Sequence, residues 1–165
     1  GMFCSPSIDN HDNIWIANPE HNQIRIFDDQ GNILRNLQGE NSNLKEPIGI
    51  FCLPNGEYLI GDKSESSLKH FDAQDNLIHE VGKTGLGVDE IYFMAWHPKH
   101  GIFGADYWNN QIVHFNNKLQ VQSIYHKPGR RAGQLGKVAG LSVCNDQLAV
   151  GNFDGGKVQI FDLSS

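Results

Sequence analysis

Two adjacent aromatic residues, Tyr107 and Trp108, are the side chains of this sequence best suited to recognising another molecule. They directly follow a short apolar segment that ends in Ala105-Asp106, so we expect them in a loop. Large aromatics in a loop provide a surface for stacking or for anchoring a protein partner. The alternative is that both rings pack against the neighbouring blade. We treat both residues as candidate ligand- or partner-binding residues.

A dense basic cluster lies in the segment HKPGRRAGQLGK, residues 126–137. Its central residues, Arg130 and Arg131, could contact a phosphate or an acidic partner, although such a cluster also suits a solvated loop. The chain as a whole has 13 Lys and Arg against 19 Asp and Glu, a formal net charge of −6. This balance argues against nucleic-acid binding, which requires a basic surface. Arg130 and Arg131 are therefore candidate residues for a ligand or a protein partner.

Eight histidines are present, and two of them, His97 and His100, form an H-P-K-H segment whose spacing could chelate a metal. No acidic residue or cysteine lies next to this segment in the sequence, so it does not predict a metal site. His21, in the segment Pro-Glu-His-Asn at 19–22, is a further candidate binding residue because of its expected loop position.

The sequence contains none of the common catalytic motifs. It lacks a G-x-S-x-G elbow, a phosphate-binding glycine loop and a Cys-x-x-Cys pair. Its three cysteines, Cys4, Cys52 and Cys144, are widely spaced, and each falls in an expected strand, where a free thiol acts as a small apolar filler. We therefore predict no catalytic residue, metal ligand or cofactor.

The sequence also excludes a membrane-spanning helix, because no stretch approaches about 18 consecutive apolar residues. Its first residues, GMFCSPSIDN, lack a basic region followed by an apolar run, so we expect no signal peptide. We expect a soluble chain and predict no particular compartment.

An internal repeat organises the chain and must position these candidate residues. Segments of the form I/L/V-x-x-Phe end at Phe27, Phe71, Phe115 and Phe161, at steps of 44, 44 and 46 residues. Nine residues before each Phe lies an Asn or Asp, which is itself preceded by Ala or Gly. These polar residues are Asn18, Asp62, Asp106 and Asn152. We interpret them as structural residues whose side chains bond the backbone of the following turn.

Each repeat is predicted to form four short strands separated by turn segments such as PNG at 54–56 and DDQGN at 28–32. No long window has helical periodicity. A repeat of about 40–50 residues with four strands is typical of a β-propeller blade. We therefore predict an all-β fold, a single propeller domain over 1–165, built from four-stranded antiparallel blades. The repeats are approximately 4–37, 48–81, 92–125 and 140–163.

The first repeat, NIWIANPEHNQIRIFDDQGNILRNL, resembles the NHL repeat. The segments GEYLIGDKSESSLKHFDAQDNLI and VQIFDLSS resemble it less closely, and the connectors VGKTGLGVDEIYF and KPGRRAGQLGKVAGLSV are similar to those of the family. One departure is that the proline of the family's connector occurs here only at Pro47.

NHL propellers include binding scaffolds, sensor domains and enzymes, so the resemblance implies a fold more than a function. We infer a non-catalytic module that binds a ligand or protein partner. The alternative is a lactonase- or lyase-type propeller enzyme that depends on calcium or zinc. A third hypothesis is RNA binding through a basic face.

In a propeller, the loops between second and third strands lie on the same face as the connectors between blades. This loop face would carry the candidate binding residues, which are His21, Tyr107, Trp108, Arg130 and Arg131.

The length predicts an unclosed propeller. At 44 residues per blade, 165 residues make about 3.75 blades, whereas NHL propellers usually close with about six. An open arc exposes an apolar blade face at each end, and such faces are rarely left uncovered. We expect either a fragment of a larger six-bladed propeller or self-association, in which two chains close a ring of about eight blades.

Overall fold

The computed structural model describes residues 5–38, 43–82 and 88–164, and these residues form four antiparallel sheets. The first sheet contains β1 (Ser7–Ile8), β2 (Ile14–Asn18), β3 (Gln23–Phe27) and β4 (Ile33–Gln38). The second contains β5 (Pro47–Cys52), β6 (Tyr58–Asp62), β7 (Ser67–Phe71) and β8 (Leu77–Val81). The third contains β9 (Ile91–His97), β10 (Gly101–Asp106), β11 (Gln111–Phe115) and β12 (Val121–Tyr125). The fourth contains β13 (Val138–Cys144), β14 (Gln147–Asn152) and β15 (Lys157–Asp162).

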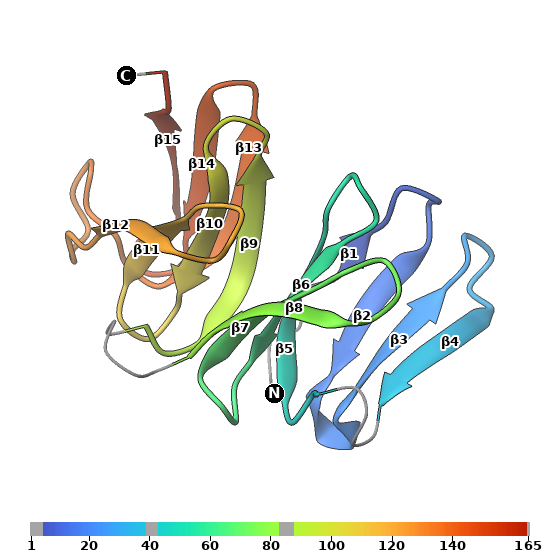
Figure 1. Ribbon diagram of the computed structural model, residues 1–165. Coiled ribbons are helices and arrows are strands. Elements are labelled where there is room, and N and C mark those ends of the chain that lie inside the picture. Colours follow the sequence, from blue (N-terminus) through green and yellow to red (C-terminus); the bar gives the residue numbers. More distant parts are fainter. Residues whose placement is uncertain (1–4, 39–42, 83–87, 165) are drawn as a thin grey trace.

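The four sheets are the blades of an open propeller, and we number them 1 to 4 along the chain (Figure 1). The first strands of successive blades, β1, β5, β9 and β13, lie side by side, and each blade continues outwards from them. The ring is not closed, and blade 4 has three described strands. The predicted all-β propeller with four repeats is therefore confirmed. The first strand of blade 1 is shorter than expected, and residue 4, where that repeat was predicted to begin, lies outside the described residues.

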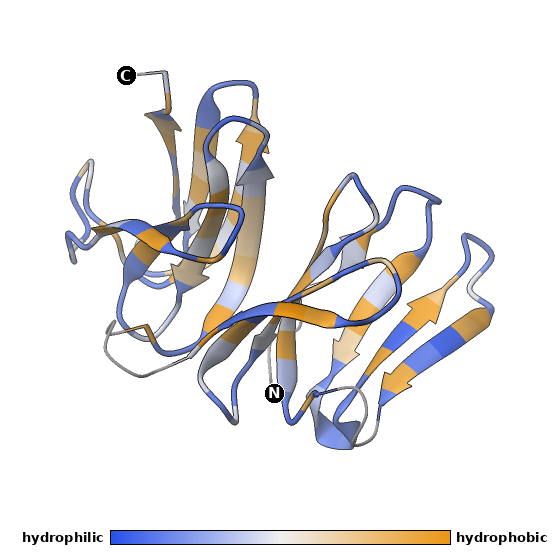
Figure 2. Cartoon of the chain, viewed as in Figure 1, coloured by the Kyte–Doolittle hydropathy of each residue, from blue (hydrophilic) through white to orange (hydrophobic). Residues whose placement is uncertain are grey.

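Hydrophobic residues concentrate in the strands and hydrophilic residues in the loops (Figure 2). Alternate strand residues face the two sides of a blade, so the apolar side chains of adjacent blades meet and form the core. One cluster, which includes Trp15, Ile60 and Phe71, fills the space between blades 1 and 2. Equivalent clusters centred on Phe115 and Val150 fill the next two inter-blade spaces.

The turns between third and fourth strands are stabilised by the same kind of hydrogen bond, from backbone amides to an Asp carboxylate. The Asp28 carboxylate accepts the backbone amides of Gln30 and Asn32 at 3.0 and 2.7 Å. Asp72, 44 residues later, bonds Gln74 and Asn76 in the same way. Such side-chain-capped turns fix the loop conformation and set the hairpin register, which explains why the strands recur at constant spacing.

The cysteines are less uniform than predicted. Cys52 is half-buried at the end of β5, and its burial raises the pKa of its thiol to about 11. Cys144 is exposed at the end of β13, so it is not an apolar filler. The preceding Val143 packs against the core between blades 3 and 4, and because side chains alternate along a strand, Cys144 lies on the opposite side. No helix in the described part of the chain has the length and apolarity needed to cross a bilayer.

His70 makes the stability of the fold dependent on pH. Its ring is buried, its Nε2 lies 2.8 Å from a Glu57 carboxylate oxygen, and its Nδ1 has no hydrogen-bond partner. Burial lowers the pKa of His70, so the folded state holds the neutral ring, while the unfolded chain takes up a proton below pH about 6.5. We expect the free energy of unfolding to decrease as the pH falls below about 6.5, and to decrease less in His70→Gln. Urea denaturation at pH 7.5 and 5.5 measures this; equal pH dependence in both proteins would contradict it.

Candidate functional site

The repeated polar residues hold the connectors on the loop face. Asp62 accepts the backbone amides of Lys45 and Glu46 at 2.7 and 3.0 Å. Asp106 accepts the Asp89 amide at 2.9 Å, and Asn152 accepts the Gly136 amide at the same distance. All three side chains are buried. Their role is structural, as predicted, and Asp106 also accepts the Asn109 backbone amide of the following turn at 3.3 Å. The partner that all three share is the connector that precedes the blade.

Backbone hydrogen bonds then join each connector to a loop between second and third strands. The amides of Lys63, Tyr107 and Phe153 donate to the carbonyls of Glu46, Glu90 and Lys137, respectively. These bonds bring two kinds of loop together at one end of each blade, opposite the hairpins β9–β10 and β13–β14 at the top of Figure 1. The loop face predicted from the repeat is thus present.

The two candidate aromatics have different environments. Tyr107 is 9% exposed and packs edge-on against Tyr92, with ring centroids 5.6 Å apart. Trp108 is 52% exposed, and its indole N–H donates to the Glu90 carboxylate at 2.8 Å. Tyr92 donates its hydroxyl to the same oxygen at 2.6 Å. Trp108 alone is therefore available to a partner, while Tyr107 packs against the fold, which was the alternative that the sequence left open.

Lys137 makes a second contact with Trp108. Its ammonium group lies 4.4 Å from the centroid of the Trp108 ring and 4.9 Å from that of Tyr107. A cation over an aromatic face is attracted by the ring quadrupole, which restrains both side chains. The exposed indole is thus held from one side by Glu90 and from another by Lys137.

Phe153 is a second exposed aromatic that the sequence did not single out as a binding residue. It occupies the position in blade 4 that Tyr107 occupies in blade 3, directly after the repeated polar residue, yet 65% of it is exposed. The signal that could have identified it is its place in the repeat, in the loop Phe-Asp-Gly-Gly at 153–156. Its backbone amide bonds Lys137, so it lies beside the Trp108 group.

Arg130 and Arg131 are exposed on the same part of the loop face. The Cγ of Arg130 lies 3.9 Å from the position that a Cβ on Gly155 would occupy, so its side chain passes over the Phe153 loop. Lys157 donates its ammonium group to the Arg131 carbonyl. Gln159 fixes the connector further by accepting the Gly133 amide at 2.7 Å.

These contacts define one continuous patch between blades 3 and 4, which we name the basic aromatic surface. Its members are Trp108, Phe153, Arg130, Arg131, Lys137 and Lys157.

His21 lies in a different part of the molecule. It is exposed in the short 3-10 turn Pro19–His21, and its Nδ1 is 3.1 Å from the Asn18 side-chain oxygen. It lines a cavity of about 600 Å³ between blades 1 and 2, together with Glu65, Lys69 and Glu80. The structure therefore does not bring His21 together with Trp108 or the arginines.

The carboxylates around that cavity pair with the buried ammonium group of Lys69. Its side chain is 2% exposed, and its ammonium group donates to Glu65 and to the Asn43 carbonyl at 2.5 Å each. Carboxylate oxygens of Asp62 and Glu80 lie 3.4 and 3.8 Å away. A buried charge is stable only when it is paired and hydrogen-bonded in this way, so the carboxylates at this site balance Lys69.

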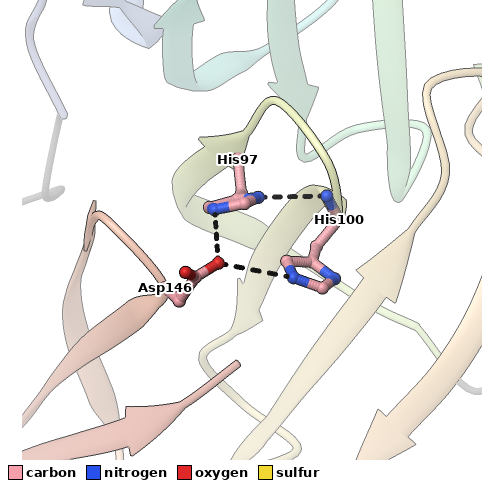
Figure 3. A group of neighbouring side chains, drawn as sticks. All are labelled: His97, His100 and Asp146. Carbon is pink, nitrogen blue, oxygen red and sulfur yellow. Dashed lines mark hydrogen bonds and ion pairs between the residues drawn. The ribbon is translucent and has the colours of Figure 1, made fainter. Parts of the chain in front are cut away.

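The H-P-K-H segment meets an acidic partner from the next blade (Figure 3). Asp146, in the β13–β14 hairpin, places one oxygen 3.4 Å from His97 Nε2 and 3.8 Å from His100 Nε2. The sequence did not reveal this partner because it comes from another repeat. Burial and the nearby His97 and Lys99 side chains lower the pKa of His100, which favours its neutral form.

This group offers three metal-ligand atoms, but the hydrogen bonds of His97 oppose metal binding. His97 Nδ1 accepts the backbone amides of Lys99 and His100 at 3.1 Å each. A neutral ring that accepts at Nδ1 carries its proton on Nε2, where it faces Asp146. A metal at Nε2 would move that proton to Nδ1, against two amide N–H groups, whereas ligating histidines normally donate from the second nitrogen. The geometry supports a polar contact between blades 3 and 4.

Comparison with known proteins identifies the fold. No family model and no curated protein matches the chain. A chain in the solved structure "Crystal Structure of Mitotic Checkpoint Complex" is similar with a TM-score of 0.71 and 14% identity, over 99% of this chain and 48% of that one. The "WD40 beta propeller domain of Doa1" is similar with a TM-score of 0.70 and 10% identity, over 94% of this chain and 48% of that one. This chain thus spans about half the length of these solved chains, and the likeness shows that it has the β-propeller fold.

Proposed function

We propose that this chain is a non-catalytic propeller module of the NHL type that binds a partner through its loop face, at the basic aromatic surface. The observation that carries the proposal is Trp108, which is 52% exposed yet fixed by Glu90 and Lys137. A large side chain already held in place loses little conformational entropy on binding, which is why such residues dominate interfaces. Similar propeller architecture in solved assemblies supports an interaction role.

The competing enzyme hypothesis has a direct test. A calcium- or zinc-dependent lactonase or lyase requires histidines and carboxylates from several first strands to converge near the axis. Among the described residues, the three side chains close enough together to share a metal ion lie instead at the β9–β10 and β13–β14 hairpins. We expect no turnover in lactonase, esterase and lyase assays with added Ca²⁺ or Zn²⁺. Turnover well above the metal-only blank would overturn the proposal.

We further propose that the module associates with a second copy of itself. Both terminal blades expose apolar side chains: Ile16 and Ile33 in blade 1, and Val158 and Ile160 in blade 4. Val158 is the repeat equivalent of Ile112, which is 5% exposed because it packs against blade 4. The outer faces therefore carry the residue types that join blades inside the chain. Blade 4 of one copy would pack on blade 1 of its partner, and two such contacts would close a ring of about eight blades.

Substitution of the blade 4 face tests this association. We expect the chain to have about twice its 18.4 kDa mass in light scattering after size exclusion, and Val158→Asp/Ile160→Asp to have the single-chain mass, because buried carboxylates oppose the contact. Ile124→Asp, at a similarly exposed isoleucine on the outer strand β12, is the matched control and should leave the mass unchanged. A monodisperse single chain at about 100 µM would contradict self-association.

A further inference from the structure

We infer that the partner held at the basic aromatic surface is an acidic peptide segment with large apolar side chains between its carboxylates. This inference rests on the proposed function, since it names the class of partner for the same surface. Its first basis is charge. In the described ranges, Arg130, Arg131, Lys137 and Lys157 form no ion pair with a carboxylate, whereas Arg35, Lys63 and Lys69 elsewhere do.

The carboxylates nearest to this surface leave its charge uncompensated. Glu90 accepts hydrogen bonds from Trp108 and Tyr92 through the same oxygen and serves the aromatic group. Asp154 lies in the Phe153 loop, packed against Gly136. Four cations against these two carboxylates make a local positive excess in a chain whose net charge is −6. Because like charges repel and opposite charges steer association, this patch selects an acidic partner.

The second basis is the arrangement of apolar and basic groups. Trp108 lies under the Lys137 ammonium group, exposed Phe153 is bonded to Lys137 through its backbone amide, and Arg130 passes over the Phe153 loop. Apolar and cationic groups so close together match a chain that carries both apolar and acidic residues. Arginine forks bind carboxylates through two parallel hydrogen bonds, and a polypeptide supplies these carboxylates at side-chain spacing.

The same features favour a peptide over RNA. Binding of a single strand uses open aromatic faces on which bases stack, together with a basic groove along the backbone. The ammonium group of Lys137 lies over the Trp108 ring, and Tyr107 meets that ring edge-on at 89°.

Fluorescence anisotropy with four labelled probes tests the inference. The probes are a twelve-residue peptide alternating Glu with Leu and Phe, the same peptide with Gln for Glu, the same with Lys for Glu, and a twelve-nucleotide oligouridine RNA. We expect the Glu peptide to bind roughly tenfold or more tightly than the Gln peptide, and its affinity to fall as NaCl rises from 50 to 300 mM. The Lys peptide should not bind.

Variants assign the binding to this surface. Arg130→Glu/Arg131→Glu should weaken the Glu peptide roughly tenfold or more, and Trp108→Ala by about tenfold, which is typical of a central aromatic. Lys99→Glu/Lys118→Glu is the matched control: it reverses two exposed charges on the hairpin side and should change affinity less than about twofold. All of these residues are on the surface, so circular dichroism and thermal midpoints should stay close to those of the unsubstituted chain.

Each contrary result has a distinct meaning. Equal affinity for the Glu and Gln peptides, with loss in Trp108→Ala, would overturn the acidic-partner inference and leave the proposed loop-face function standing. Tighter, arginine-dependent binding of the RNA would overturn it in favour of RNA. Binding that Trp108→Ala and the arginine reversals leave unchanged would overturn both the inference and the proposed use of this surface.

Discussion

Gly61→Ala is expected to lower the free energy of unfolding by about 3 kcal/mol. Gly61 lies in β6, and a Cβ at this position would be 2.0 Å from the backbone carbonyl oxygen of Ile91 in blade 3. The obstacle is backbone rather than a flexible side chain, and β9 is held there by its contacts with β5. The methyl group can therefore be accommodated only if blades 2 and 3 separate, which would disturb the core between them.

The repeat supplies a matched control for this prediction. Gly151 is the equivalent residue of blade 4, and a Cβ there would have its nearest neighbour, the Gly140 carbonyl oxygen, at 3.8 Å. We expect Gly151→Ala to change the free energy of unfolding by less than about 1 kcal/mol, as ordinary substitutions without a clash do. Urea denaturation of both variants, in the Val158→Asp/Ile160→Asp background to remove any contribution of self-association, measures the difference. Equal losses would show that close packing of the blades is not what requires glycine at 61.

Asp62→Ala is expected to cost about 3 kcal/mol. The substitution removes the acceptor of the Lys45 and Glu46 amides and one of the carboxylates around the buried Lys69 ammonium group. Asp62 is 1% exposed, so little water can replace it. An unsatisfied donor and an undercompensated charge in a buried site both destabilise the folded state, which explains the large expected effect.

Two further variants separate these contributions. Asn18→Ala alters the equivalent position of blade 1, where, among the described residues, the side chain is hydrogen-bonded to the exposed His21, and we expect a loss below about 1 kcal/mol. Adding Lys69→Met to Asp62→Ala should restore part of the stability, because it removes the charge that lost a partner. Denaturation midpoints in urea provide the measurement. A double variant less stable than Asp62→Ala would contradict the role assigned to Lys69.

The architecture could be predicted from the sequence because a repeat reports on local geometry. Three features recur about every 44 residues: the strand positions, the turns at Asp28 and Asp72, and the buried polar residues Asp62 and Asp106. They recur because each blade needs the same hairpin register. The prediction of structural roles for these polar residues was correct. The sequence did not reveal their hydrogen bonds to the preceding connector, because a partner 16 or 17 residues earlier leaves no local signal.

The candidate site was predictable only in outline, because it depends on contacts between blades. The sequence by itself determined an all-β chain of four propeller repeats, and it placed Tyr107, Trp108, Arg130 and Arg131 in loops on one face. Only the tertiary structure decided that Tyr107 is buried, that Trp108 and Phe153 are exposed beside Lys137, and that Asp146 meets His97. The physical reason is that periodicity is set by hydrogen bonding and packing within a blade, whereas the exposure of a loop side chain also depends on the neighbouring blade, whose side chains differ from one repeat to the next.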